Sequence, residues 1–293
     1  MSGSLIERAA RVYDFEAHLR ARAPAEAIDL PPEPMFTAEA APAPAFVPRG
    51  EVEAVDRAVL AKNNLLIPGA PVTVLAEEFR LIKRNLLVAA RTIDAAKART
   101  ILVCSARPGD GKTFCAVNLA ISMAAERDRR VLLVDADFAK PGVMERVGLA
   151  ERRGLLDALA DDAVDPESLV VPTDVPQLSL LAAGTRSIND TELAASDRMG
   201  AVLARLLAAD PQRLVIFDSP PALAASPAAV LSLLVGQVLF VVRADRTSLS
   251  EVAGAMQLLG GCPEVKLMLN SVAYTPGLRF GSYYGPDGQE MGQ

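Results

Sequence analysis

The chain has 293 residues, 51% of them hydrophobic, and carries a formal net charge of −6 at pH 7. This length and apolar content suffice for one large or two small globular domains with a sizeable core. The acidic balance argues against a nucleic-acid binder, because a phosphate backbone requires a basic face, and leaves open only a local basic patch.

The cysteines and the single histidine limit the chemistry further. Cys104, Cys115 and Cys262 lie far apart without a Cys-x-x-Cys spacing, which is typical of buried free thiols in a reducing compartment. His18 is the only histidine and lies in the N-terminal segment, so a histidine metal cluster and a Ser-His catalytic pair are excluded. Charged residues interrupt the apolar segment that a secretory signal needs at the N-terminus, and we therefore expect a cytoplasmic protein.

The first 70 residues are expected to precede the folded domain. Residues 4–19 have the spacing of an amphipathic helix, which either docks on a partner or frays. Seven of the 21 prolines fall between residues 24 and 48, among alanines and acidic residues, which is the composition of an extended, disordered linker. We assign residues 1–22 to the N-terminal helix and 23–70 to the linker.

A long amphipathic helix is predicted at the start of the folded domain, which we place at residues 71–273. Apolar residues recur at spacings of three and four from Leu75 to Ile93, so that one stripe faces the core. The opposite face carries charged residues, Glu77 and Arg80 among them. Taken alone, that face is a solvated surface.

Short apolar runs then alternate with helical stretches, and the runs cover residues 100–105, 131–134, 178–181, 214–217, 238–242 and 265–269. Short strands separated by helices predict a mostly parallel sheet in a three-layer α/β fold. Residues 219–242 carry no charge, but prolines and a glycine break the segment. We therefore predict a loop, a short helix and a buried strand there, without a membrane span.

A phosphate-binding loop follows the first strand. Residues 106–113 read Ala-Arg-Pro-Gly-Asp-Gly-Lys-Thr, with alanine where the strict pattern has glycine, and a helix is predicted from there to about residue 126. Glycines let backbone N–H groups approach phosphates closely, the helix N-terminus and the lysine favour negative charge, and the threonine hydroxyl suits magnesium. The sequence therefore predicts a P-loop NTPase fold that binds ATP and Mg²⁺. The nucleotide contacts are assigned to Pro108, Gly109, Asp110, Gly111, Lys112, Thr113 and Phe114.

Three aspartates end strands of the predicted sheet. Asp135 and Asp137 follow residues 131–134, and Asp218 follows residues 214–217. Ligands bind at the carboxyl ends of parallel strands, so we expect these carboxylates beside the phosphate loop. Asp218 has the position of a Walker B aspartate, which holds magnesium opposite the phosphates. The Asp-x-Asp pair places negative charge where a hydroxyl nucleophile loses its proton, although Asp137 serves equally well as a helix cap.

Two features are predicted near the C-terminus. Asn270 ends the last strand, where it either reads the edge of an adenine or closes a turn. Residues 274–293 are rich in glycine and polar residues and form an expected mobile tail. Tyr283 and Tyr284 have little to pack against in such a tail, which favours them as phosphorylation sites, whereas Tyr274 lies close to the strand and is expected to be structural.

Four motifs occur in the order found in one family. They are Glu-Glu-Phe-Arg-Leu-Ile-Lys-Arg-Asn at residues 77–85, the phosphate loop, residues 131–141, and Leu-Val-Ile-Phe-Asp-Ser-Pro-Pro at residues 214–221. With these motifs and its tyrosine-bearing tail the chain resembles the bacterial tyrosine kinases (BY-kinases), P-loop kinases of polysaccharide export, and most closely their exosortase-associated autokinase branch. The resemblance implies an ATP-dependent protein-tyrosine autokinase that regulates exopolysaccharide biosynthesis and export.

The resemblance also implies a role for each matching residue in catalysis. Lys112 neutralises the β and γ phosphates, and Thr113 and Asp218 hold Mg²⁺. Asp135 takes the proton of the tyrosine and is also assigned as a metal ligand. Asp137 positions Asp135 or the metal.

Subunit contacts and a partner are implied in the same way. One motif through which family members contact neighbouring subunits is matched by Glu77, Arg80, Lys83 and Asn85, with Lys83 where arginine is usual. Tyr283 and Tyr284 are then acceptors offered to a neighbouring subunit of a homo-oligomer. Without a spanning helix of its own, the chain is expected to be activated by a membrane chain-length-determinant (polysaccharide co-polymerase) protein, which recruits it to the inner face of the membrane.

Two other functions stay open at this point. A positioning ATPase of the ParA/MinD type hydrolyses ATP without transferring phosphate to protein, but such proteins carry lysine at the position of Arg107. The second alternative is a non-catalytic, nucleotide-dependent scaffold for the polysaccharide machinery.

Overall fold

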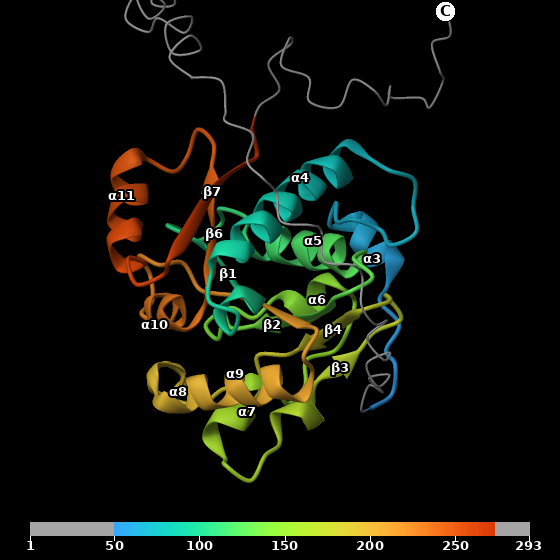
Figure 1. The fold of residues 1–293 in the computed structure, drawn as a ribbon, viewed down its shortest axis with the longest axis vertical. Coiled ribbons are helices and arrows are strands. Elements are labelled where there is room, and N and C mark those ends of the chain that lie inside the picture. Colours follow the sequence, from blue (N-terminus) through green and yellow to red (C-terminus); the bar gives the residue numbers. More distant parts are fainter. Residues whose placement is uncertain (1–49, 273–293) are drawn as a thin grey trace, which may run out of the picture. The chain divides into compact units, whose positions relative to one another are not determined.

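The computed structural model describes residues 50–272 (Figure 1). The expected N-terminal helix, most of the proline-rich segment and the tyrosine-bearing tail lie outside this range. Within it, one sheet is formed by β1 (Thr100–Ser105), β2 (Arg130–Asp135), β3 (Val171–Pro172), β4 (Leu178–Leu181), β5 (Arg213–Asp218), β6 (Gln237–Arg243) and β7 (Glu264–Asn270).

The strand order is β3-β4-β2-β5-β1-β6-β7, and only the β3–β4 pair is antiparallel. This confirms the mostly parallel sheet and the α/β fold. The chain turns to opposite sides of β1, because β5 and β2 lie on one side of that strand and β6 and β7 on the other. Such a reversal opens a crevice at the carboxyl ends of the strands, where ligands bind.

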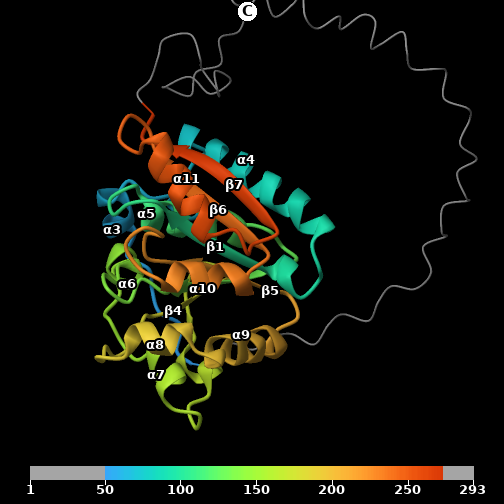
Figure 2. The ribbon, with the colours of Figure 1, turned by 90° about the vertical axis from the view of Figure 1, so that its left-hand side faces the viewer.

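Helices cover both faces of the sheet. They are α3 (Arg57–Lys62), α4 (Val74–Ala89), α5 (Lys112–Ala124), α6 (Val143–Arg146), α7 (Leu155–Ala160), α8 (Asp190–Ala195), α9 (Asp197–Ala209), α10 (Pro227–Leu234) and α11 (Leu249–Leu258), with short 3-10 helices at Ala90–Thr92, Lys97–Arg99 and Pro166–Leu169. Helices α4 and α5 pack on one face, and α7 to α11 pack on the other (Figures 1 and 2). The three layers predicted from the sequence are confirmed.

Strand β1 shows why the strands appear as unbroken apolar runs. Ile101 and Val103 belong to the core shared with α4 and α5, whereas Leu102 and Cys104 belong to the core on the other face. Because successive side chains of a strand point to opposite faces and both faces are covered, every residue of β1 is buried.

Residues 53–66 belong to the packed domain, which corrects the linker boundary expected at residue 70. Val55, Leu60, Leu65 and Leu66 are buried in the core that contains α4 and α5. Helix α3 begins after Asp56, whose carboxylate accepts the N–H groups of two residues in the first turn. The apolar residues of this stretch follow neither a helical nor a strand period. The proline-rich composition before it therefore led to a predicted domain start that was too late in the sequence.

Two other expectations concern burial. Cys104, Cys115 and Cys262 are all free and buried, as predicted. The charge-free residues 219–242 form a loop, helix α10 and strand β6. Across residues 50–272, no helix combines the length and the apolar character needed to cross a membrane.

Candidate functional site

The phosphate loop joins β1 to α5 at the carboxyl edge of the sheet. Gly109 has φ of 85° and Gly111 has φ of 98°, both in the left-handed region that favours glycine. A Cβ at Gly111 would lie 2.1 Å from Nδ2 of Asn270, whereas a Cβ at Gly109 would meet nothing within 4 Å. Both glycines therefore allow a backbone conformation that other residues rarely adopt, and Gly111 also allows the close approach of Asn270.

Lys112 is the first residue of α5, and its side chain is almost entirely buried. Its Nζ lies 3.8 Å from Oδ2 of Asp137, which is buried as well. Burial raises the pKa of Asp137, and the positive charge of Lys112 opposes that shift. The lysine and the partial positive charge of the helix N-terminus thus meet at the loop, as an anion site requires.

Asp135 is held in one orientation by the backbone. Its Oδ2 accepts the N–H groups of Gly142 and Val143 at 2.8 and 2.9 Å, and its Oδ1 accepts the N–H of Asp137 at 3.2 Å. Burial raises the pKa of Asp135 to about 6, against the opposing effect of these hydrogen bonds. The carboxyl is therefore held in a fixed orientation, with a pKa above its ordinary value.

Asp218 stands opposite Asp135 in the register of β5 and β2. Both of its carboxylate oxygens are buried without a hydrogen-bond partner among the described residues, and the Thr113 hydroxyl lies near enough to act on the carboxyl. Burial and the charge of Asp135 raise the pKa of Asp218 to about 8, whereas Thr113 and Lys112 lower it. A buried carboxylate without partners is costly and calls for a proton or a cation.

A hydrated divalent cation fits these donors. Placed between Asp218 and Thr113, it would satisfy the two orphaned oxygens, and Asp135 is the neighbouring carboxylate. No group of three or more His, Cys, Asp or Glu side chains in residues 50–272 is arranged to hold a metal by itself. Mg²⁺ usually takes one or two carboxylates from a protein and its other ligands from phosphates and water.

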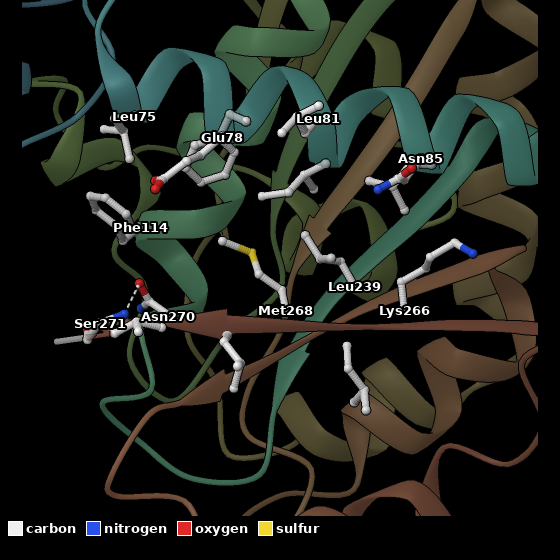
Figure 3. A pocket seen from close by; sticks show the side chains of 16 residues that line it. Leu75, Glu78, Leu81, Asn85, Phe114, Leu239, Lys266, Met268, Asn270 and Ser271 are labelled. Carbon is white, nitrogen blue, oxygen red and sulfur yellow. Dashed lines mark hydrogen bonds between the residues drawn. The ribbon is translucent and has the colours of Figure 1, made fainter. Parts of the chain in front are cut away.

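Asn270, the last residue of β7, holds the phosphate loop through its side chain. Its Nδ2 donates to the carbonyl of Asp110 at 2.8 Å. Its Oδ1 accepts the N–H of Ser271 at 2.9 Å (Figure 3). Ser271 has φ of 57°, so the chain turns sharply there. Of the two roles predicted for Asn270, the turn is present. One amide hydrogen of Asn270 remains for another acceptor.

A groove of about 660 Å³ runs from this point between α4 and β7. Phe114 and Asn270 lie at one end of the groove, and Asn85 and Lys266 lie at the other (Figure 3). Phe114 also packs edge-on against Phe79, with ring centroids 6.4 Å apart. The end that contains Phe114 adjoins the phosphate loop, so it is an apolar space beside the place where phosphates would bind.

Sequence reasoning missed three residues that contact the loop, namely Arg243 at the end of β6, Thr247 in the segment that follows, and Glu251 in α11. Arg243 donates from Nη1 to the carbonyl of Gly109 at 2.8 Å, and Thr247 donates from Oγ1 to Oδ1 of Asp110 at 3.1 Å. Glu251 pairs with Arg107 at 3.1 Å. The available signal was that Arg243 ends a strand at the same edge as Asp135 and Asp218.

The predicted subunit-contact residues lie on α4. Glu77 and Arg80 form an ion pair with each other at 2.5 Å, and the Arg80 side chain is half exposed. Lys83 is occupied within the chain, because its Nζ lies 2.6 Å from Glu126 and 3.1 Å from the carbonyl of Ser122 on α5. Asn85 lines the groove. The predicted acceptors, Tyr283 and Tyr284, lie outside the described residues.

Known proteins share this domain. A protein-family model described as an AAA domain matches residues 98–272. The putative tyrosine-protein kinase EpsB of Ralstonia nicotianae is 35% identical over 190 residues, which are 62% of this chain and 25% of EpsB. The tyrosine-protein kinase YwqD of Bacillus subtilis is 29% identical over 226 residues, which are 76% of this chain and 92% of YwqD.

One solved structure adds to these two relatives. The BceF tyrosine kinase domain is 31% identical, with a TM-score of 0.56 over 66% of this chain and 76% of that domain. The chain therefore spans most of YwqD and of the BceF domain, but only a quarter of the length of EpsB.

Proposed function

The chain belongs to the bacterial tyrosine kinase family, with an AAA domain at residues 98–272. From this premise we propose that it uses ATP to phosphorylate Tyr283 and Tyr284 of a neighbouring copy of the same chain. The observation that carries the proposal is the set of buried carboxyls at the phosphate loop. Asp135 and Asp218 end neighbouring strands, and their pKa values are raised to about 6 and about 8.

Phosphoryl transfer depends on positioning and on neutralising charge. The N–H groups of residues 109–113 and the ammonium of Lys112 bind the phosphates of ATP. The phenolic oxygen of a tyrosine attacks the γ-phosphorus, the new P–O bond forms, and the bond from the γ-phosphorus to the bridging oxygen of ADP breaks. The phenolic proton then passes to a nearby carboxylate.

Asp135 is the group we assign to that proton. Oδ2 is occupied by two backbone N–H groups, whereas Oδ1 accepts a single one at 3.2 Å and is the freer oxygen. A pKa of about 6 leaves the group ionised at neutral pH and ready to accept. Asp137 supports it, because its N–H fixes Oδ1 and its carboxylate faces Lys112 at 3.8 Å.

Mg²⁺ is assigned to Thr113 and Asp218, with Asp135 as a further ligand. When bound, it would neutralise negative charge on the phosphates. The orphaned oxygens of Asp218 support this assignment. The adenine is assigned to the apolar end of the groove at Phe114, where the second amide hydrogen of Asn270 reads its edge.

Self-association and a membrane partner complete the proposal. Glu77 and Arg80 present an exposed ion pair on α4 to a neighbouring subunit, whereas Lys83 stays bound to α5. The chain works in the exosortase-associated branch of exopolysaccharide synthesis, and a membrane chain-length-determinant protein activates it and brings it to the inner face of the membrane. These points rest on the motifs at residues 77–85 and on the tail.

Incubation of the full chain with ATP and Mg²⁺ tests the proposal, with phosphosite mass spectrometry and a free-phosphate assay on the same sample. Phosphotyrosine in the tail is the expected result. Free phosphate without modified protein would instead indicate a positioning ATPase, and neither product would indicate a nucleotide-dependent scaffold. Asp135→Asn serves as the matched variant, since it keeps the size of the side chain and removes its capacity to accept the proton.

A further inference from the structure

The phosphate loop contains an acidic residue that has to be kept away from the phosphates. Asp110 is 3% exposed. Its Oδ2 accepts the N–H of Arg107 at 3.0 Å, and its Oδ1 accepts the hydroxyl of Thr247 at 3.1 Å. The carboxylate is therefore turned onto the backbone of its own loop and onto the segment that follows β6.

That segment forms a tight turn against the outer side of the loop. The hydroxyl of Thr247 also accepts the N–H of Arg243 at 3.2 Å, and the N–H of Thr247 donates to the carbonyl of Arg243 at 3.0 Å. The side chain of Arg243 reaches from this turn to the carbonyl of Gly109 at 2.8 Å. One threonine hydroxyl thus links the turn to Asp110, and one guanidinium links it to Gly109.

These contacts fix the direction of the peptide groups that a phosphate chain uses. In a trans peptide the C=O and N–H of one unit point in opposite directions. With the carbonyl of Gly109 held outward by Arg243, the N–H of Asp110 points to the opposite side. The carbonyl of Asp110 is held outward by Asn270, so the N–H of Gly111 also points to the opposite side.

We infer that Arg243 and Thr247 are positioning residues for nucleotide binding, which act through Gly109 and Asp110 to keep loop N–H groups turned toward the phosphates. The inference deepens the proposed function and rests on its ATP site. It gives a role to a turn that lies 134 residues from Gly109 in the sequence. The turn then holds the phosphate loop in place through its hydrogen bond to the carboxylate of Asp110.

Thr247→Val and Thr247→Ser form the matched pair that tests this role. Valine keeps the shape and loses the hydroxyl, whereas serine keeps the hydroxyl. We expect Thr247→Val to weaken the binding of both ADP and Mg·ATP about tenfold in calorimetric titration, since a hydrogen bond to a charged group is lost. Thr247→Ser should bind as wild type does. Ser250→Ala, which removes a hydroxyl of the same region that hydrogen-bonds to Ser248, is the control.

The readout separates positioning from general stability. Affinity is measured on folded protein, and the melting temperature without nucleotide should differ little between Thr247→Val and Thr247→Ser. Wild-type affinity in Thr247→Val, or equal weakening in both variants, would overturn the inference. Binding of nucleotide by the wild type without tyrosine phosphorylation would reject the proposed kinase function and leave this inference standing.

A double-mutant cycle gives a second, independent reading. If Thr247 acts through the Asp110 carboxylate, Thr247→Val should change nucleotide affinity by less than about twofold in an Asp110→Asn background. Two effects that multiply without coupling would show that Thr247 does not act through Asp110, and the inference would fail.

Discussion

Asp135 and Asp218 face each other as the last residues of adjacent strands, and both side chains are fully buried. Their proximity raises the pKa of Asp218, in addition to the larger effect of burial. The parallel sheet therefore holds two carboxyls closer than their charges favour. Such an arrangement is unfavourable for folding alone, and it suits a site that receives a cation.

The first prediction follows from the raised pKa of Asp218. Between its ordinary pKa of 3.8 and the folded value of about 8, the native state keeps a proton that the unfolded chain has released. The stabilisation that this proton gives is complete at acid pH and is lost as pH rises through that window. Without metal, Asp218→Asn should remove this loss and be more stable than wild type at alkaline pH by at least about 1 kcal/mol.

Urea unfolding in a chelating buffer, from about pH 5 to about pH 9, measures the slope directly. Wild type should lose stability more steeply than Asp218→Asn. Parallel slopes for the two proteins would contradict the assignment of the proton to Asp218.

The second prediction compares the two loop glycines. Gly109→Ala adds only the strain of a positive φ, about 1–2 kcal/mol. Gly111→Ala adds the same strain and also drives its Cβ into Asn270, so it should lose more stability and more nucleotide affinity. Adding Asn270→Ala should restore part of the stability of Gly111→Ala. Equal losses in both glycine variants would show that Asn270 does not pack tightly on the loop.

The third prediction concerns self-association through α4. Arg80→Glu breaks the ion pair with Glu77 on an exposed surface, so the free energy of unfolding should change by less than about 0.5 kcal/mol. Light scattering should report a smaller mass for this variant if the pair contacts a neighbouring subunit. Arg91→Glu makes the same charge change outside the motif and should keep the wild-type mass. An unchanged mass for Arg80→Glu would remove this residue from the subunit contact.

The fourth prediction concerns the acceptors. Replacing both Tyr283 and Tyr284 by Phe should remove most of the phosphate label while ADP still binds with wild-type affinity, because the nucleotide site lies in the folded domain. Tyr274→Phe should keep the label. Quantitative phosphopeptide mapping distinguishes these cases, and a label retained at other positions in the double variant would refute the tail as the main acceptor.

The sequence predicted the central strands well because β1, β2 and β5 are buried on both faces, so that hydropathy alone marks them. Strand ends were less certain. Strand β5 includes Arg213, which the apolar run excluded, because that guanidinium is buried against Glu167 through two hydrogen bonds of 2.5 and 2.7 Å. A polar residue can extend a strand when a distant partner satisfies it, and hydropathy does not reveal the partner.

The sequence likewise predicted one part of the candidate site and missed another. The phosphate loop and the strand-end aspartates are local patterns, and the sequence placed them together correctly. Arg243 and Thr247 escaped, because what identifies them is contact with a loop more than a hundred residues away. Lys83 was assigned to a subunit contact from its motif, although Ser122 on α5 offers it a carbonyl and Glu126, just after that helix, offers it a carboxylate. Such pairings depend on how helices pack, which no local pattern contains.

Titration of the protein with Mg·ATP, beside the same titration of Lys112→Met, tests the central claim most directly. Wild type should bind one nucleotide per chain saturably, and Lys112→Met should bind about 100-fold more weakly, since it lacks the charge that meets the phosphates. Circular dichroism should show both proteins folded. Absence of binding in the wild type, or equal affinity in the two proteins, would contradict the account.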